Sequence, residues 1–183
     1  MRIRGVVLAD YVKIVRTTRN LDWESFLNDE DWEIIKSMVI PTEWYPAEVI
    51  GRIGRGMFVL LSNSNYEFVR AFGRKNGDEH FDPATQKFFK KDDPVAALGV
   101  FAAIASRFAD EINAKLEKTG ENFAEVTFFP VDGAPSWDCY REVQAGYIEW
   151  IVEENGGKNP RAEIRHEERE GREACIIRVT WEK

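Results

Sequence analysis

Apolar residues in the first half of the chain recur every three or four positions, which is the spacing of one face of an α-helix. Asn28 and Asp93 stand where N-caps are expected, because a short polar side chain accepts a hydrogen bond from the first turn of a helix. Pro94 suits the first helical position after such a cap. We therefore expect helices over residues 7–15, 29–38, 47–61 and 66–73 and from Pro94, a short turn over 23–27, a polar loop over 75–82 and a helical turn over 83–89.

Three glycines, Gly51, Gly54 and Gly56, lie inside the helix expected over residues 47–61. Each glycine costs an exposed helix about 1 kcal/mol relative to alanine. Such a cluster therefore predicts either the close approach of another backbone or a break in the helix.

The second half of the chain changes to the two-residue alternation that is typical of strands. Ile112, Ala114 and Leu116 alternate with polar residues, and residues 123–129 form the next expected strand. A helical alternative stays open for the first of these segments, because Phe108, Ile112 and Leu116 are spaced four apart.

A long amphipathic helix is expected next, with Ser136 as its N-cap and Gly156–Gly157 at its end. Two further alternating segments, 162–166 and 174–181, predict a second hairpin. The order of elements is thus helices, hairpin, helix and hairpin. This order indicates the α+β class, with a helical N-terminal half followed by an antiparallel sheet and a helix packed on one of its faces.

The length of 183 residues suits one domain with a substantial core. We expect a single domain over 1–183, with a mainly helical part at 1–108 and a hairpin–helix–hairpin part at 109–183. A hydrophobic content of 44% and a charged content of 31% argue against a disordered, fibrous or membrane protein. The formal charge of −7 argues against nucleic acid and anionic lipid as partners.

The N-terminal apolar run stops at Asp10, which leaves it too short for the core of a signal peptide. The longest apolar stretch, residues 94–106, falls short of the ~20 residues that a membrane span needs. We therefore expect no membrane span, a cytoplasmic location, and reduced thiols at Cys139 and Cys175.

The histidines and cysteines form no recognised catalytic or metal-binding motif. His80 lies among acidic residues, but the spacing matches no metal site, and a solvated loop is the favoured interpretation. His166 lies in an alternating segment and is interpreted as part of a charged surface. Cys175 fits a small core residue, and Cys139, near a helix N-terminus, has no partner in a redox motif. No catalytic residue and no metal ligand is predicted.

Aromatic residues make up 13% of the chain, with six Trp and 12 Phe. Aromatic side chains usually form core, but they also line apolar ligand pockets that carry few polar groups. Trp44 and Tyr45 precede one expected helix, and Trp137 and Tyr140 begin another. These four residues are candidates for a pocket or an interface.

Several motifs follow one another along the chain. They include Val6-Val7-Leu8-x-x-Tyr11, Ile40-Pro41-x-x-Trp44-Tyr45-Pro46, Phe68-Val69-Arg70-Ala71-Phe72-Gly73-Arg74, Ala145-Gly146-Tyr147-Ile148 and Cys175-Ile176-Ile177-Arg178-Val179-Thr180-Trp181. Their order resembles a family of uncharacterised proteins from myxobacteria and other deltaproteobacteria. The C-terminal motifs also resemble a wider superfamily of heme nitric-oxide-binding domains, 4-vinyl reductase domains and subunits of the TRAPP vesicle-tethering complex.

The resemblance implies an α+β module that holds an apolar or tetrapyrrole-like molecule between its helices and its sheet. The heme branch uses a helix histidine as axial ligand and Tyr-x-Ser-x-Arg for the heme carboxylates. The helix from Pro94 contains no histidine, and the region offers only Tyr140–Arg141 without that spacing. The cysteines of the vinyl-reductase branch are reduced to Cys175 at most. We therefore expect no heme bound through an axial histidine, and Arg141 joins the candidate ligand-binding residues.

The resulting hypothesis is a non-enzymatic sensory or adaptor domain that binds a small apolar ligand, with no cofactor identified. It predicts an apolar pocket between the helical half and the sheet. Two alternatives stay open. One is a ligand-free module for protein interaction or homodimer formation, which predicts an exposed apolar patch around Trp44, Tyr45 or Trp137. The other is an enzyme that modifies a tetrapyrrole or a lipid.

Overall fold

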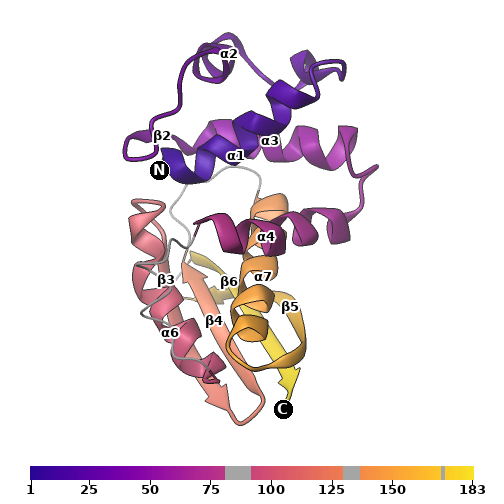
Figure 1. The fold of residues 1–183 in the computed structure, drawn as a ribbon. Helices are drawn as coiled ribbons and strands as arrows, with labels where there is room; N and C mark the ends of the chain where they lie inside the picture. The colour runs from indigo at the N-terminus through magenta and orange to yellow at the C-terminus, as the bar shows by residue number, and fades with distance from the viewer. Residues whose placement is uncertain (81–91, 130–136, 170–171) are drawn as a thin grey trace.

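The chain forms a helical half and a sheet-containing half that follow each other in sequence (Figure 1). The structure is a computed structural model that describes residues 1–80, 92–129, 137–169 and 172–183. The first half contains β1 (Arg2–Arg4), α1 (Gly5–Thr17), the 3-10 turn η1 (Trp23–Ser25), α2 (Asp29–Lys36), β2 (Trp44–Pro46), α3 (Ala47–Leu60) and α4 (Tyr66–His80). The second half contains α6 (Pro94–Ile104), the 3-10 turn η2 (Ala105–Arg107), β3 (Asn113–Gly120), β4 (Phe123–Phe129), α7 (Trp137–Glu154), β5 (Lys158–Arg169) and β6 (Arg172–Glu182). The predicted α+β class is confirmed.

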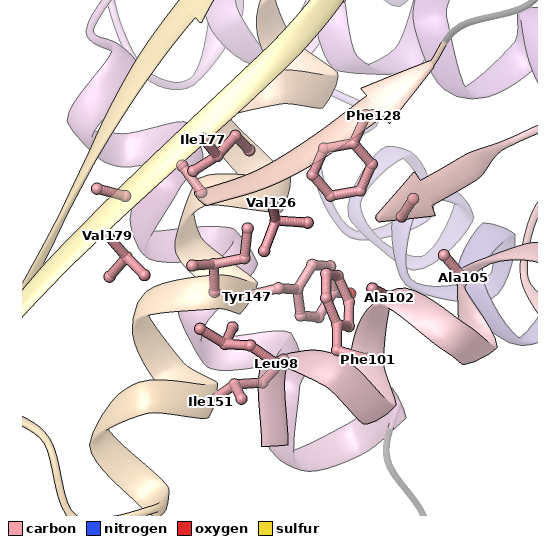
Figure 2. Packing of buried hydrophobic residues seen from close by; sticks show 14 of the residues in the cluster. Leu98, Phe101, Ala102, Ala105, Val126, Phe128, Tyr147, Ile151, Ile177 and Val179 are labelled. Carbon is pink, nitrogen blue, oxygen red and sulfur yellow. The ribbon is translucent and has the colours of Figure 1, made fainter. Parts of the chain in front are cut away.

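The four long strands form one antiparallel sheet in the order β3-β4-β6-β5. Alternate residues of the two central strands face α6 and α7, which pack on the same face of the sheet (Figure 1). Figure 2 shows this layer, in which Val126, Phe128, Ile177 and Val179 from the sheet meet Leu98, Phe101, Tyr147 and Ile151 from the helices. Burial of this apolar layer holds the sheet-containing half together.

A separate group of buried side chains forms the core of the helical half. Its largest fully buried members are Leu8, Trp23, Ile35, Ile53 and Met57. These residues come from α1, η1, α2 and α3, so each helix turns its apolar stripe toward the others. Met1 and Phe72 pack against both this core and the core of the sheet-containing half.

The predicted cap at Asn28 is confirmed as a reciprocal capping box. The Asp31 N–H donates to Asn28 Oδ1 at 2.9 Å, and the Asn28 N–H donates to Asp31 Oδ2 at 3.0 Å. Asp31 is buried, and Arg52 of α3 donates to both of its carboxylate oxygens, at 2.6 and 2.8 Å. The cap therefore also ties α2 to α3 through a paired buried charge.

The helix α3 is unbroken, and close packing explains one glycine of its cluster, Gly56. A Cβ atom at Gly56 would lie 2.6 Å from Cζ3 of the Trp23 ring. The neighbour is therefore an indole side chain instead of the backbone that the pattern suggested. At Gly54 the nearest atom would be Cβ of Cys139 at 3.5 Å, an ordinary contact distance.

The prediction that the fourth helix ends near Gly73, followed by a polar loop over 75–82, is wrong, because α4 continues to His80. Gly73 and Gly77 face α7 instead of ending the helix. A Cβ at Gly73 would lie 2.2 Å from the Val143 carbonyl oxygen, and one at Gly77 would lie 2.2 Å from the Trp150 ring. Helix packing thus outweighs the low helix propensity of glycine. The expected turn at 83–89 and the cap at Ser136 lie outside the described residues.

The sequence pattern did not predict the two-stranded sheet of β1 and β2. The two strands pair antiparallel, with Ile3 opposite Tyr45 and Arg4 opposite Trp44. An isolated bridge between Ile3 and Ala109 continues this contact into the second half of the chain. Each strand has only three residues, which is too short for a two-residue alternation to stand out.

No helix within the described ranges is long and apolar enough to cross a membrane.

Candidate functional site

The candidate site lies where the two halves of the chain meet. Phe72 of α4 reaches both cores, and its ring packs edge-to-face against Tyr11 of α1, with ring centroids 5.2 Å apart. Two small apolar cavities lie in this region. An apolar, enclosed position between packed helices is a common place for a ligand to bind.

The first cavity, here the α3 cavity, lies between the N-terminal helices and the beginning of α7. Its volume is about 20 Å³, and nearly all of its surface is apolar. Its lining includes Tyr11 of α1, Gly54 and Met57 of α3, Val69 of α4 and Cys139 of α7. A cavity of this size has room for about one water molecule, but an apolar lining offers water few partners.

The second cavity, here the α6 cavity, lies between the N-terminal segment, α6 and α7. Its volume is about 50 Å³. Val7, Phe101, Ala105, Gln144 and Tyr147 are among its lining residues. Gln144 contributes a side-chain amide to this lining, and Tyr140 and Tyr147 carry hydroxyl groups. The other lining residues are apolar, so the cavity suits a mainly apolar guest.

Tyr140 and Ile3 line both cavities. Tyr140 projects from α7 and is half-buried, and Ile3 comes from β1. Burial raises the pKa of Tyr140, and the nearby Cys175 raises it further. Burial likewise raises the pKa of Tyr11, with Tyr140 and Cys139 adding to the effect. A tyrosine is already neutral at neutral pH, and burial opposes the deprotonation of these two phenols still more strongly.

Among the sequence-predicted candidates whose side chains the structure describes, Tyr140 lines the cavities, and Trp44, Tyr45 and Arg141 do not. Trp44 lies in β2 and makes cation–π contacts with two arginines. The Arg4 and Arg2 guanidinium carbons lie 4.0 and 5.6 Å from its ring centroid. The Tyr45 hydroxyl accepts a hydrogen bond from the Ile40 N–H at 2.9 Å. Neither Trp44 nor Tyr45 is among the lining residues of the α3 and α6 cavities.

Arg141 lies on a different side of α7 from Tyr140. Its side chain is buried, and its Nη1 lies 3.0 Å from Nε2 of His166 on β5. Arg141 thus points to the sheet edge and does not line either cavity. Trp137 begins α7, but its side chain lies outside the described part of the structure.

Sequence reasoning missed Ile3, Phe101 and Met57 as lining residues. Phe101 and Met57 were placed on helix stripes and interpreted as core, because a stripe does not show which of its members face a gap. Ile3 belongs to a strand that the pattern did not predict. The aromatic content was the usable signal, since Tyr11, Phe101, Tyr140 and Tyr147 all reach the cavities.

Two arginines of α4 fasten the helical half to α7 beside the cavities. Arg70 Nη2 lies 2.7 Å from Glu142 Oε2, and Arg74 Nη1 lies 3.2 Å from Glu149 Oε2. Glu149 is buried and also accepts a hydrogen bond from the Ala162 N–H of β5 at 2.9 Å. The network therefore connects α4, α7 and β5 through buried or half-buried charges.

The described residues contain no group of three or more His, Cys, Asp or Glu side chains placed to hold a metal ion. Cys139 and Cys175 are both buried and not joined in a disulfide. The core-facing residues of α6 are Ala97, Leu98, Phe101 and Ala102, and α6 contains no histidine.

The comparisons with known proteins concern the fold. No protein-family model and no curated protein matches the sequence. Solved structures of H-NOX domains do match. A point mutant of the T. tengcongensis H-NOX domain aligns with 14% identity and a TM-score of 0.66, over 99% of this chain and 98% of that one.

Two further structures agree. An H-NOX domain designated Cs, which carries an unnatural cyano-phenylalanine, aligns with 15% identity and a TM-score of 0.67, over 99% of this chain and 97% of that one. An oxygen-binding H-NOX domain related to soluble guanylate cyclases aligns with 14% identity and a TM-score of 0.63, over 99% of this chain and 96% of that one. The chain therefore has an H-NOX-like fold, and each of these alignments covers 99% of it.

Proposed function

We propose that this protein is a non-enzymatic sensory or adaptor domain that binds a small apolar molecule beside Tyr140. The single observation that carries the proposal is the pair of apolar cavities that share Ile3 and Tyr140 where the two halves meet. The similarity in fold to an oxygen-binding H-NOX domain supports a ligand in the interior. The scarcity of convergent polar groups in the lining argues against an enzyme, which needs them for its chemistry.

The side chains that the structure describes do not fit a heme held through an axial histidine. α6 has no histidine, His166 is exposed on β5, and the side chain of His80, at the end of α4, lies outside the described part of the structure. The raised pKa values of Tyr11 and Tyr140 keep both phenols neutral, and a neutral phenol is a poor substitute for a tyrosinate ligand. These observations support our proposal that the ligand is not heme, and no step of the proposed function passes through an iron centre.

The size of the cavities limits the ligand. Volumes of about 20 and 50 Å³ lie far below the ~300 Å³ at which drug-sized ligand pockets begin. A molecule of a few heavy atoms fits without rearrangement, and a larger one requires Tyr140 to turn out of its position between the cavities. Tyr140 is therefore the residue whose rotation sets the size of an accepted ligand.

Binding beside Tyr140 would act directly on α7. This helix contacts α3, α4, α6, β5 and β6, so it is packed against both halves of the chain. A ligand shifts a conformational equilibrium only by its differential affinity for the two states. In this proposal the two states differ in the rotamer of Tyr140 and in the position of α7 relative to α3.

Native mass spectrometry of the purified protein, with an absorption spectrum of the same sample, tests the proposal. We expect no heme absorption band, and a bound mass that is lost from a variant with filled cavities, Gly54→Ala combined with Ala105→Leu. Stoichiometric heme would contradict the exclusion of heme. Equal bound mass on the wild type and on the filled variant would contradict the location of the site.

A second function, that of an interaction module, is supported by one group of exposed side chains. Val59 at the end of α3 and Tyr66 and Phe68 at the start of α4 are each more than 40% exposed. Tyr66 stacks on Phe58, with centroids 4.5 Å apart, which connects the two helices there. Concentration-dependent sedimentation that disappears in Val59→Ser combined with Phe68→Ser would favour this function, and a monomer at all concentrations would contradict it.

A further inference from the structure

A groove on the outer side of the helical half, here the α1–α4 groove, has the features of a second binding site. It is formed by one face of each helix, because its lining residues recur at helical spacing. They are Asp10, Lys13, Ile14 and Thr17 of α1 and Phe68, Ala71, Phe72, Lys75 and Asn76 of α4. Its volume is about 370 Å³, which falls within the range of small-molecule sites. It shares no lining residue with the α3 and α6 cavities.

The polar feature that points to a ligand is Asn76. The residue is only 4% exposed, and its Nδ2 has no hydrogen-bond partner within the described part of the chain. A buried amide donor left without an acceptor costs about 1–3 kcal/mol. Asn155, which is also buried, shows the usual solution, since its Nδ2 donates to the Ile151 carbonyl at 2.7 Å. An acceptor atom in the groove would give Asn76 the partner that Asn155 has within the fold.

The remaining lining defines the rest of the ligand. Phe68 and Phe72 provide aromatic surface, and the groove is more apolar than polar. Lys13 and Lys75 bring one cation from each wall, and Asp10 brings one carboxylate. In a chain with a formal charge of −7, two lysines facing one groove are a local excess of positive charge.

We propose that the α1–α4 groove binds a small amphipathic carboxylate with a flat apolar body. The carboxylate accepts a hydrogen bond from Asn76 Nδ2 and lies between Lys13 and Lys75, and the apolar body packs on Phe68 and Phe72. This site is independent of the apolar cavities, so the proposal goes beyond the proposed function and does not depend on it.

The probe for the test is 2-naphthoate, which combines a carboxylate with a flat aromatic body. Its titration is followed through the side-chain amide signals of Asn76 and Asn155 in ¹⁵N-labelled protein. We expect saturable shifts of the Asn76 amide at millimolar concentrations or below, while the Asn155 amide stays in place. The neutral ketone 2-acetonaphthone, which keeps an acceptor oxygen but no charge, is expected to bind about tenfold more weakly.

Two variants separate binding from folding. Asn76→Leu removes the unpartnered donor, so we expect a stable protein whose affinity for 2-naphthoate falls about tenfold or more. Lys75→Ala is expected to weaken 2-naphthoate and to leave 2-acetonaphthone unchanged. An unmoved Asn76 amide in the millimolar range, or full affinity in Asn76→Leu, would overturn the proposal. Tyr140→Ala serves as a control that alters the apolar cavities and leaves the groove intact.

Discussion

Gly73 of α4 and Gly146 of α7 bring the backbones of their two helices into direct contact. A Cβ at Gly73 would lie 2.2 Å from the Val143 carbonyl oxygen, and a Cβ at Gly146 would lie 2.1 Å from the Arg70 carbonyl oxygen. The contact is reciprocal, because each glycine faces the residue three positions before the other glycine. This close approach places α4 beside α7, and with it Phe72, which packs against both cores.

Gly73→Ala is predicted to destabilise the protein by about 2–3 kcal/mol, because the new methyl group meets backbone that cannot move aside without separating the helices. Gly99→Ala in α6 is the matched control. The nearest atom to its Cβ would be Leu116 Cδ2 at 3.7 Å, so the higher helix propensity of alanine should stabilise by up to about 1 kcal/mol. Urea unfolding of both variants measures the difference, and equal effects would refute the close approach.

Glu149→Ala is predicted to lower the free energy of unfolding by about 3 kcal/mol, since it leaves the Ala162 N–H without its acceptor and Arg74 without a buried partner. Glu149→Gln keeps an acceptor oxygen and should cost less. Thermal unfolding compares the two variants. If both cost the same small amount, Glu149 does not connect α7 to β5 in the way described.

Acid is predicted to weaken the sheet through Glu125. Its buried carboxylate lies 3.0 Å from each of Lys118 Nζ, Arg165 Nη2 and Arg178 Nη1. The hydrogen bond from Lys118 holds the pKa of Glu125 below its ordinary value of 4.5. Burial of the carboxylate raises this pKa, but Arg178 and Arg165 lower it further, so the net shift is downward. A lowered folded pKa contributes stability that is present above 4.5 and is lost as the pH falls through the folded pKa.

The check is the pH dependence of unfolding for the wild type and for Glu125→Gln. The wild type should be the more stable at pH 7. The difference in free energy of unfolding between wild type and variant should shrink as the pH falls below 4.5. A gap that stays constant through this range would show that the three cations do not stabilise the carboxylate.

Tyr140→Ala is predicted to join the α3 and α6 cavities, which Tyr140 and Ile3 both line. Loss of the ring should destabilise by about 3 kcal/mol and create an apolar space near the ~150 Å³ that holds benzene in an engineered cavity. Benzene should therefore raise the melting temperature of Tyr140→Ala and not that of the wild type. Tyr140→Phe keeps the ring, so benzene should leave its melting temperature unchanged, as in the wild type. An equal change in the wild type and both variants would show that benzene binds outside the joined cavity.

Much of the fold could be predicted from the sequence, because the long elements have strong periodicity. The stripe of α7 and the alternation of β6 each follow one clear pattern, and Asn28 caps α2 as a local rule requires. The extent of α4 could not be predicted, since Gly73 and Gly77 suggest an end until α7 is known to lie against them. Local propensity gives way to tertiary packing at these two positions.

The site was harder to predict than the fold. Tyr140 was selected because aromatic residues at a helix start suggest a pocket, and it lines both cavities. The same argument selected Trp44, whose ring instead lies against the guanidinium groups of Arg2 and Arg4. Ile3 could not be found, because its place in the lining depends on pairing with Tyr45 more than 40 residues later. Lining residues are set by contacts between distant segments, which one-dimensional periodicity does not contain.

The most direct test of the central claim is a crystal of the wild-type protein held under xenon, a monatomic apolar probe. We predict an anomalous xenon peak beside Tyr140 and Ile3, in the α6 cavity, and the loss of this peak in Ala105→Leu, which fills that cavity. Xenon bound only on the outer surface, or the same peak in wild type and variant, would contradict a ligand site where the two halves meet.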